Sequence, residues 1–544
     1  MLSPTRDTVR RTRAPLPDGD VDVAIVGAGP GGLMAGAILA RAGLRVALFE
    51  QHYVAGGCVT MFERGRSENR YSFDVGLHYV GDCGAGGELP RLLGLAGVEL
   101  NWLPLDPDGF DTLVFPDFEF RVPVGHEAFR DRLLEHFPKE KKGIDRYMRL
   151  LLEVDRISRK MDKSGKPGFG LLADVLLHGR LLAKYQESTI GAFLDSCTSD
   201  MRLRAVLLGQ SGDYGLPPSK CSAMLHAGLV NHYLHGAYYP EGGGQAPSDA
   251  LAEAIEAAGG SIHLRRGIAQ ILVENGRAIG VRTEASCKEP SVEVRARVVL
   301  SNADLKRTIL ELLPRESLPD AWRARADGFE MAGAIFMTFL GIEGDLADLG
   351  MRNCNYWCFD GYDMEGFYRD AMVQGRVQPR GCYITSASMK DRGTEGHAPA
   401  GHMGLEIMSL VPGKPSDWGA TDDEAVRGRY RRGGAYRDQK ARIEAQMIDR
   451  AEALLPGVRE RLRFRESATP LSQMRYTRAS DGTGYGLAAT PEQFLRHRPG
   501  YRGPFDGLYF CGASTRAGHG VVGAMKSGEA AAKRILADLE SPRR

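Results

Sequence analysis

No run of 18 consecutive apolar residues occurs in this chain, so the sequence offers no candidate for a transmembrane helix. The chain also lacks an excess of either charge, because 70 Lys and Arg residues stand against 69 Asp and Glu residues. This balance is unlike the basic composition of nucleic-acid-binding proteins, and we expect no nucleic-acid partner. The first 20 residues lack the apolar core of a signal peptide, so we expect a flexible tail there and a cytoplasmic protein.

The nine cysteines are odd in number and scattered, which favours reduced thiols inside a cell over a disulfide framework. Cys354 and Cys358 stand four apart, but no second pair of Cys or His has the spacing of metal ligands. We therefore expect no metal site. No internal repeat is visible. The content of 43% apolar and 26% charged residues is typical of a globular protein, and the length allows two intertwined domains.

A glycine-rich turn near the start of the chain carries the strongest signal. Residues 21–26 read as a buried strand, 27–32 spell Gly-Ala-Gly-Pro-Gly-Gly, and 33–40 read as a helix. A second strand follows at 45–49 and ends at Glu50. This order of strand, glycine turn, helix, strand and acid is typical of dinucleotide-binding units.

Each element of this turn has a physical role in that interpretation. Gly27 makes the tight turn, Gly29 lets the backbone approach a pyrophosphate, and Gly32 lets the helix pack on the strand. The free N–H groups at the start of the helix favour phosphate binding. Glu50 is placed to accept hydrogen bonds from the adenosine ribose hydroxyls. The turn by itself leaves open whether the ligand is FAD or NAD.

Further strands of the same sheet are expected far along the chain. We predict strands at 259–264, 268–274, 278–283, 297–303 and 507–512, with helices at 247–258 and 521–539. The fold class is therefore α/β, with a parallel, doubly wound Rossmann-like sheet. The expected division is a tail at 1–20, a discontinuous nucleotide-binding domain at 21–75, 247–315 and 496–540, and a substrate-binding domain at 76–246 and 316–495.

Two other segments have a distinctive composition. Residues 393–437 are rich in Gly, Arg and Asp, which predicts a long surface loop. Residues 168–184 are apolar with sparse basic residues. One interpretation of that segment is peripheral contact with a membrane surface, and the other is a buried helix of the substrate-binding domain.

Four stretches together resemble a known family. They are the glycine turn with its continuation at 50–58, the run 71–81, the run 226–243, and the pair of segments 508–512 and 518–524. This combination is similar to the carotenoid and retinoid FAD oxidoreductases, which include phytoene desaturases, carotenoid isomerases and, most closely, retinol saturase. The resemblance extends over about residues 20–540. It implies non-covalent FAD, a p-hydroxybenzoate-hydroxylase or amine-oxidase type of fold with an inserted α+β substrate domain, and a long apolar polyene or isoprenoid substrate.

The resemblance also implies a set of cofactor-binding residues. The expected positions are Gly27, Ala28, Gly29, Pro30, Gly31, Gly32, Glu50, Gln51, Gly57, Cys58, Gly76, Leu77, His78, Ile268, Asn302, Ala303, Gly512, Ala513 and Val522. Two of them depart from the family pattern, since many relatives have Arg at the position of Cys58 and many flavoproteins have Asp at that of Ala513. The helix beginning near Val522 is expected to direct its N-terminus at the pyrimidine ring of the flavin, where negative charge develops on reduction.

Few side chains are needed for catalysis, because a flavin performs the redox chemistry itself. His78 is the first candidate for proton transfer, since its ordinary pKa is close to neutrality; the alternative is packing against the flavin. Tyr239 and Glu241 are candidates for lining a substrate tunnel, although the glycines that follow also fit a simple turn. His232 reads as an interior histidine. His519 is either a flavin contact or a loop residue.

The sequence thus predicts an FAD-dependent oxidoreductase that acts on carbon–carbon double bonds of a polyene, by saturation, desaturation or isomerisation. Since a glycine turn between a strand and a helix, with an acid at the end of the next strand, is recognised only at 21–50, any NAD(P)H must bind transiently at the same pocket; otherwise the electrons come from or go to a partner, a quinone or oxygen. One alternative is reductive cyclisation of a polyene natural product. Another is a non-enzymatic lipid carrier, although a carrier is expected to lose the phosphate glycines and Glu50, which this chain keeps.

Overall fold

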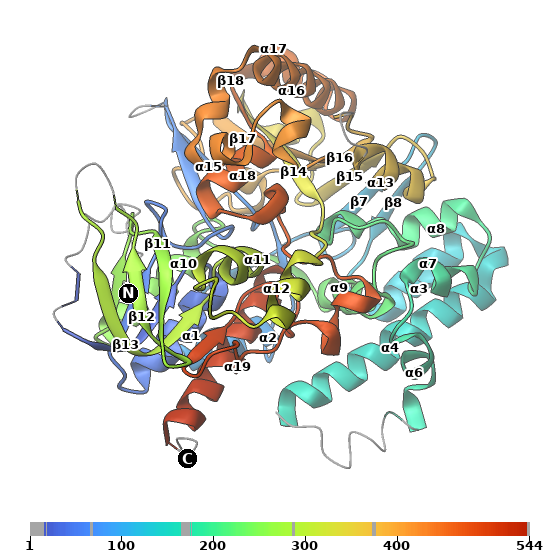
Figure 1. Ribbon diagram of the computed structural model, residues 1–544. Helices are drawn as coiled ribbons and strands as arrows, with labels where there is room; N and C mark the ends of the chain where they lie inside the picture. The colour runs from blue at the N-terminus through green and yellow to red at the C-terminus, as the bar shows by residue number, and fades with distance from the viewer. Residues whose placement is uncertain are drawn as a thin grey trace.

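The computed structural model describes residues 16–17, 19–65, 69–164, 175, 177–285, 289–372 and 377–540. Most of the expected tail at 1–20, and much of the apolar segment at 168–184, lie outside the described residues. Three lobes surround the centre of the molecule (Figure 1). One holds the glycine turn, one holds a second large sheet, and one is helical. Among the residues described, no helix combines the length and apolar composition needed to cross a membrane.

The first lobe is built on a seven-stranded sheet. Its strands are β1 (Val21–Val26), β2 (Val46–Phe49), β10 (Ser261–His263), β11 (Ile268–Glu274), β12 (Arg277–Thr283), β13 (Glu293–Ser301) and β19 (Leu508–Phe510). The order β10-β2-β1-β13-β19 is parallel throughout, and β12 and β11 continue from β13 as an antiparallel pair. The predicted parallel sheet is confirmed, and the strands predicted at 268–274 and 278–283 form an antiparallel hairpin.

Helices pack on one face of this sheet, which fits the apolar sequence of β2 and the mostly apolar sequence of β1. They are α1 (Pro30–Arg41), α2 (Glu88–Leu95), α10 (Ala246–Ala257) and α19 (Gly520–Glu540). The hairpin β11–β12, the short α11 (Leu305–Arg307) and α12 (Asp320–Asp327) belong to the opposite side. The sheet is therefore covered on both faces, as expected of a doubly wound unit.

The second lobe is built on a mixed sheet of order β18-β14-β17-β16-β15-β7-β8. Its strands are β7 (Asp111–Val114), β8 (Glu119–Val122), β14 (Ala334–Glu343), β15 (Asn355–Phe359), β16 (Gly381–Thr385), β17 (His402–Val411) and β18 (Leu462–Ala468). Neighbours are antiparallel except β15 and β7. Short helices and α16 accompany it: α13 (Met364–Met372), α14 (Ala387–Lys390), α15 (Asp422–Arg427), α16 (Gly434–Leu454), α17 (Val458–Arg461) and α18 (Pro470–Thr477).

The prediction of a surface loop over 393–437 is wrong. Strand β17 occupies His402–Val411 and pairs with both β14 and β16 in the interior of the sheet. Residues 404–411 are all buried. The polar, glycine-rich flanks of the segment gave it the composition of a loop, although its centre is an apolar strand.

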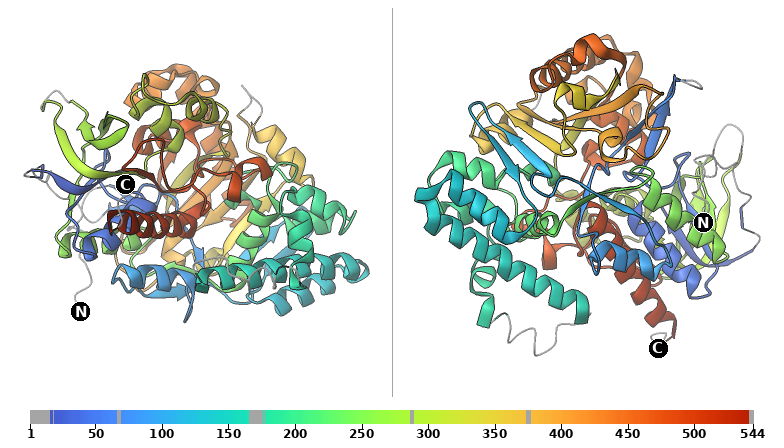
Figure 2. Two further views of the ribbon diagram at one scale, coloured as in Figure 1. Left: turned by 60° about the horizontal axis from the view of Figure 1, so that its bottom comes forward. Right: turned by 180° about the vertical axis from the view of Figure 1, so that it is seen from behind.

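The third lobe is helical and lies on the opposite side of the molecule from the β11–β12 hairpin (Figure 2). It contains α3 (His126–His136), α4 (Lys141–Ser164), α6 (Arg180–Tyr185), α7 (Ile190–Asp195), α8 (Met201–Leu207) and α9 (Ala223–Leu234). Two small sheets connect the lobes, formed by β3 (Met61–Arg64) with β4 (Tyr71–Asp74), and by β5 (Val80–Gly81), β6 (Trp102–Pro104) and β9 (Ala237–Pro240).

Candidate functional site

A single large cavity of about 1970 Å³ lies where the three lobes meet. Drug-sized ligands occupy pockets of about 300–1,000 Å³, so this cavity has room for a dinucleotide together with a second long molecule. Of the predicted cofactor residues, its wall contains Gly27, Gly29, Pro30, Glu50, Gln51, Gly57, Cys58, Gly76, His78, Ile268, Asn302, Ala303, Gly512, Ala513 and Val522. Ala28, Gly31, Gly32 and Leu77 lie behind this wall.

The glycine turn has the backbone that a pyrophosphate requires. Gly27 has a φ of +93°, a conformation that favours glycine. Helix α1 begins after Gly29 without a side-chain cap, so its first N–H groups are available to an anion. A Cβ added at Gly29 would lie 2.9 Å from Asn302 Nδ2, and one at Gly32 would lie 2.3 Å from the carbonyl oxygen of Gly27. These residues therefore fit the adenylate and pyrophosphate part of FAD.

Glu50 lies at the carboxyl end of β2, where its carboxylate is held by two backbone groups. Oε2 accepts from the N–H of Ala28 at 2.9 Å, and Oε1 accepts from the N–H of His52 at 2.7 Å. The residue is only 8% exposed, and burial raises its pKa. Each oxygen keeps further acceptor capacity, which is the chemistry needed to bind ribose hydroxyls.

Cys58 and Gly76 form the next part of the wall. Gly57 has a φ of +58°, and a Cβ added to it would lie 3.2 Å from the Cα of Gly29. The sulfur of Cys58 accepts from Gln473 Nε2 at 3.0 Å, and burial raises the pKa of this thiol. Cys58 thus presents a neutral thiol to the cavity.

The last strand of the sheet brings Gly512 and Ala513 to the same cavity. The N–H of Gly512 donates to Ser527 Oγ at 2.8 Å, so this group is already occupied by α19 and is not free to bind the second phosphate. The carbonyl of Ala513 accepts from Arg498, a buried guanidinium that also donates to the carbonyl of Leu487. Ala513 therefore has a structural role, because its backbone carbonyl binds the guanidinium of Arg498.

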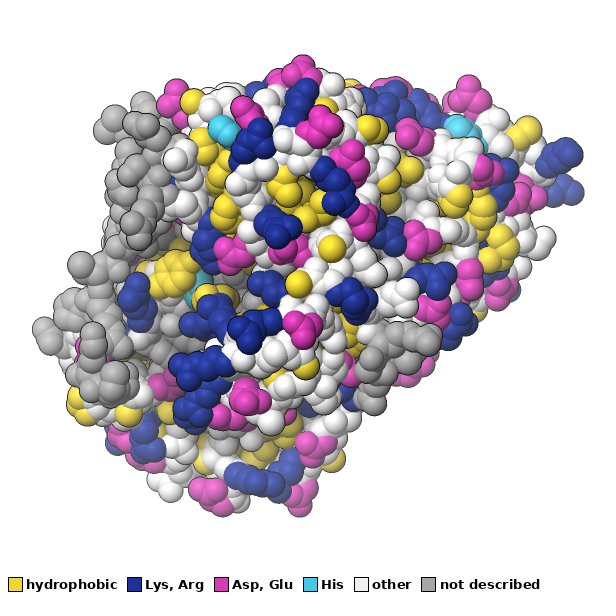
Figure 3. All heavy atoms as spheres, turned by 90° about the horizontal axis from the view of Figure 1, so that it is seen from above, with side chains coloured by type: hydrophobic (Ala, Val, Ile, Leu, Met, Phe, Trp, Pro, Cys, Tyr) yellow, Lys and Arg dark blue, Asp and Glu magenta, His cyan; other side chains and the backbone are white. Residues whose placement is uncertain are grey.

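Basic side chains surround part of the cavity. Lys and Arg gather around a hollow on the face seen from above (Figure 3). The basic residues of the cavity wall on the two β-lobes include Arg64, Arg307, Arg431, Arg437, Lys440 and Arg478. Positive charge around a cavity favours an anionic ligand, as expected for the phosphates of FAD.

His78 connects the cavity to a buried polar cluster. Its Nδ1 lies 2.8 Å from Glu406 Oε2, and its Nε2 has no hydrogen-bond partner in the described structure. The ammonium of Lys390 donates to the carbonyl of His78 and to Thr385 Oγ1. Burial, together with the nearby Lys390, lowers the pKa of His78 to about 4. At neutral pH the imidazole is therefore uncharged and has the character of a proton acceptor.

The carboxyls of this cluster are also shifted. Burial and the neighbouring Glu406 raise the pKa of Asp74 to about 6, and burial raises that of Glu406 to about 7. One ligand atom from each of Asp74, His78 and Glu406 lies within 4.8 Å of the others, a spacing that would suit a metal ion. Lys390, whose pKa is lowered to about 8 by burial, supplies positive charge to the same cluster.

The structure places Tyr239 and Glu241 away from the expected tunnel. The Tyr239 hydroxyl is fully buried and donates to Asp74 Oδ2 at 2.6 Å, so it supports the cluster behind His78. Glu241 is exposed, and its Oε2 accepts from Asn101 Nδ2 at 2.8 Å. Neither residue is part of the cavity wall. Because a strand alternates its side chains, Tyr238 and Tyr239 point to opposite faces, which the sequence did not resolve.

His232 and His519 differ in the hydrogen bonds of their ring nitrogens. His232 Nε2 accepts from the N–H of Gly81 at 2.7 Å, which confirms an interior histidine, although its side of α9 also contributes to the cavity wall. His519 stacks against Tyr485 with ring centroids 5.6 Å apart. Neither of its ring nitrogens makes a hydrogen bond of normal geometry within the described residues.

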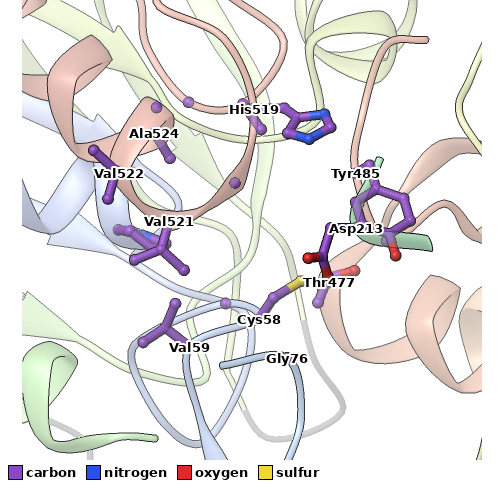
Figure 4. Close-up of a pocket in the computed structure, with 18 of the residues that line it drawn as sticks. Cys58, Val59, Gly76, Asp213, Thr477, Tyr485, His519, Val521, Val522 and Ala524 are labelled. Atoms are coloured by element: carbon purple, nitrogen blue, oxygen red, sulfur yellow. The ribbon is translucent and has the colours of Figure 1, made fainter. Parts of the chain in front are cut away.

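Figure 4 shows one end of the cavity, with residues from distant parts of the chain around it. His519, Val521, Val522 and Ala524 at the start of α19 lie opposite Cys58 and Val59. Asp213 and Tyr485 complete the wall between them. No sequence signal marks Asp213, because it occurs in an ordinary Ser-Gly-Asp turn without a recognisable motif.

Comparison with known protein families gives two matches. The NAD(P)-binding Rossmann-like domain matches residues 25–94, and the flavin containing amine oxidoreductase family matches residues 437–536. Solved structures share the fold. An oxidoreductase from Methanosarcina mazei has a TM-score of 0.61 at 18% identity, and a putrescine oxidase bound to putrescine has 0.59 at 17%. Each covers 96% of this chain and 100% of its own, which confirms the predicted fold class.

Curated relatives align over most of the chain. The all-trans-retinol 13,14-reductase of Danio rerio is 28% identical over 485 residues, which cover 86% of this chain and 77% of the relative. The human enzyme of the same name is also 28% identical, with the same coverage. The chloroplastic prolycopene isomerase of Arabidopsis thaliana is 24% identical over 98% of this chain and 85% of its own. The chain is therefore a homologue of the carotenoid and retinoid FAD oxidoreductases, as its four motifs predict.

Proposed function

We propose that this protein is an FAD-dependent oxidoreductase that saturates a carbon–carbon double bond of a long apolar polyene or isoprenoid. The observation that carries the proposal is the continuity of one cavity. At one end it contains the glycine turn and Glu50, and elsewhere its wall is apolar and aromatic, with Met224, Leu225, Met337, Phe339, Trp357 and Leu410. A dinucleotide and a hydrocarbon chain can thus share one continuous cavity.

In this proposal, different parts of the chain bind different parts of FAD. The N-terminus of α1 favours the pyrophosphate, and the carboxylate of Glu50 accepts hydrogen bonds from the adenosine ribose. The N-terminus of α19, beginning at Gly520, presents its positive end to the cavity and favours a negatively charged ring. When bound, FAD supplies hydride and electron transfer in this site.

The protein contributes orientation, exclusion of water and proton transfer. His78 presents an uncharged imidazole to the cavity, held through Nδ1 by Glu406. Tyr239 and Asp74 position this pair from behind. We propose that His78 takes part in proton transfer during turnover and that residues 76–246 and 316–495 together form the substrate-binding part of the molecule.

The choice of saturation over desaturation or isomerisation rests on the names of the reductases among the relatives. The lipid-carrier alternative is disfavoured, because Gly27, Gly29, Gly32 and Glu50 keep the backbone and the carboxylate of a dinucleotide site. For electron supply, we propose that NAD(P)H enters the same cavity transiently, since the chain has one glycine turn of this kind.

The test begins with the purified protein. It should be yellow and should release FAD on denaturation; a colourless protein that does not take up added FAD would refute the proposal. Anaerobic mixing with NADH or NADPH should then bleach the flavin absorption. Adding retinol, a carotene or a shorter polyene should restore it, with a product two hydrogen masses heavier than the substrate. A product of unchanged mass would instead indicate isomerisation.

A further inference from the structure

A buried chain of hydrogen bonds ends at the cavity wall in Asp213, the last residue of the turn η3 (Ser211–Asp213). Its Oδ2 lies 2.8 Å from the hydroxyl of Tyr79. The same hydroxyl lies 3.1 Å from Asp111 Oδ2 on the far side. In Figure 4 Asp213 lies across the cavity from the start of α19, beside Tyr485 and near the sulfur of Cys58.

The proton count in this chain indicates that one of the two carboxyls is protonated. A tyrosine hydroxyl has one hydrogen, so it donates to one carboxyl and accepts from the other only if the second is protonated. Asp111 also accepts from Gln210 Nε2 at 2.8 Å and from Asn355 Nδ2 at 3.0 Å. Asp111 thus accepts from two side-chain amides, whereas Asp213 has the hydroxyls of Tyr79 and Tyr233 as partners, and we take Asp111 as the ionised carboxyl. Asp213 is therefore the carboxyl that holds the proton.

We propose that Asp213 is the proton donor that completes saturation of the substrate double bond, an inference that rests on the proposed function. Hydride, with two electrons, is transferred from the reduced cofactor to one carbon of the double bond. The O–H bond of Asp213 breaks, and its proton bonds to the neighbouring carbon. The product gains two hydrogens, the flavin is oxidised, and the Asp213 carboxylate takes a new proton from water. Reduced pyridine nucleotide is the electron source that restores the cofactor.

The surroundings of Asp213 support this role. Burial and the nearby charge of Asp111 raise its pKa to about 8, so the acid keeps its proton at neutral pH. The other titratable groups around it are Tyr79, Tyr233, Tyr368, Tyr383, Tyr485 and His519. His78, with a pKa of about 4, is deprotonated at that pH. The pKa values of these two groups are thus shifted in opposite directions, and of the two only Asp213 carries a proton at neutral pH.

The decisive comparison is between wild type, Asp213→Asn and Asp213→Glu. Asparagine keeps the size and polarity of the side chain but has no acidic proton. We expect the asparagine variant to bind FAD and to be bleached by NAD(P)H as wild type is. Reoxidation of its flavin by the polyene should be about 10²–10⁴-fold slower, the usual contribution of a general acid. The glutamate variant should recover part of the rate, with a changed pH profile. Asp320→Asn, on exposed α12 and outside the cavity wall, is the matched control.

A second readout needs no cofactor. Between pH 3.8, the ordinary pKa of an aspartate, and about 8, the folded protein holds a proton on Asp213 that the unfolded chain has lost. The free energy of unfolding should therefore fall as pH rises through this window, and this loss should be absent in Asp213→Asn. The stability of the variant relative to wild type should accordingly increase from pH 4 to pH 8, and Asp320→Asn should show no such trend.

The outcomes separate the two proposals. A wild-type protein that saturates a polyene, with an Asp213→Asn variant that is equally fast, overturns the role of Asp213 and leaves the proposed function standing. A wild-type protein that binds no FAD or saturates no polyene overturns both. A stability difference between wild type and Asp213→Asn that stays constant with pH overturns the protonated state of Asp213, and with it the proton donor.

Discussion

At the scale of single residues, Glu50 links the ligand to the backbone. Glu50→Arg would place a cation where the carboxylate accepts the N–H groups of Ala28 and His52. We expect FAD to be lost on purification, and Glu50→Gln to bind it roughly tenfold to hundredfold more weakly, since hydrogen bonds to a charged group contribute about 1.5–3 kcal/mol. Flavin released per mole of protein is the measurement. Unchanged flavin content in the arginine variant would contradict the ribose assignment, and circular dichroism checks that each variant is folded.

His78 is the second residue whose role can be isolated. His78→Ala should leave FAD bound, because the glycine turn and Glu50 are untouched, and should slow turnover with the polyene by about 10²–10⁴-fold if the imidazole transfers a proton. Single-turnover flavin kinetics under anaerobic conditions give the rate. Glu406→Gln keeps a hydrogen-bonding group beside Nδ1 and should give a smaller decrease. Equal rates in wild type and His78→Ala would reduce His78 to a packing residue.

At the scale of elements, the contact between α1 and α19 holds both helix N-termini at the cavity. A Cβ added at Gly528 of α19 would lie 2.2 Å from the carbonyl oxygen of Gly31 in α1. Gly528→Ala should therefore separate the helices, at a cost of about 1–3 kcal/mol, and weaken FAD binding. Thermal unfolding and flavin content measure the two effects.

The matched control for this contact is Gly94→Ala in α2. A Cβ at Gly94 meets no atom within 4 Å, and alanine in a helix is favoured over glycine by about 0.5–1 kcal/mol. This control should be neutral or slightly more stable than wild type. If Gly528→Ala were as stable as Gly94→Ala and kept its flavin, the packing of the two helices would not be what positions the site.

At the scale of the whole molecule, we predict that FAD and the hydrocarbon substrate occupy different parts of one cavity. Gly228 on α9 is part of the wall, and a Cβ there meets no atom within 4 Å. Gly228→Phe should fill space needed by the hydrocarbon chain and leave the glycine turn intact. We expect normal flavin content, a raised KM for long polyenes and a smaller effect on short ones, with Gly228→Ala close to wild type. Loss of flavin in Gly228→Phe would contradict the division of the cavity.

The sequence by itself determined the dinucleotide unit. Its signals are local: a buried strand, a turn that needs glycine at Gly27, an uncapped helix and Glu50 at the end of the next strand. The parallel sheet follows from these signals, because buried strands joined through helices pair in parallel. The loop predicted over 393–437 hides the strand at 402–411, because short-range composition does not show which strands a segment pairs with.

Only the tertiary structure decided the rest of the site. Glu406 lies 328 residues from His78 in sequence, and Asp213 lies 134 residues from Tyr79. Whether a carboxyl keeps or loses its proton depends on its burial and on neighbours from other elements. Tyr239 was predicted in the substrate tunnel, and the fold placed it behind His78 instead. Such long-range contacts have no counterpart in local sequence patterns, because they exist only once the three lobes close around the cavity.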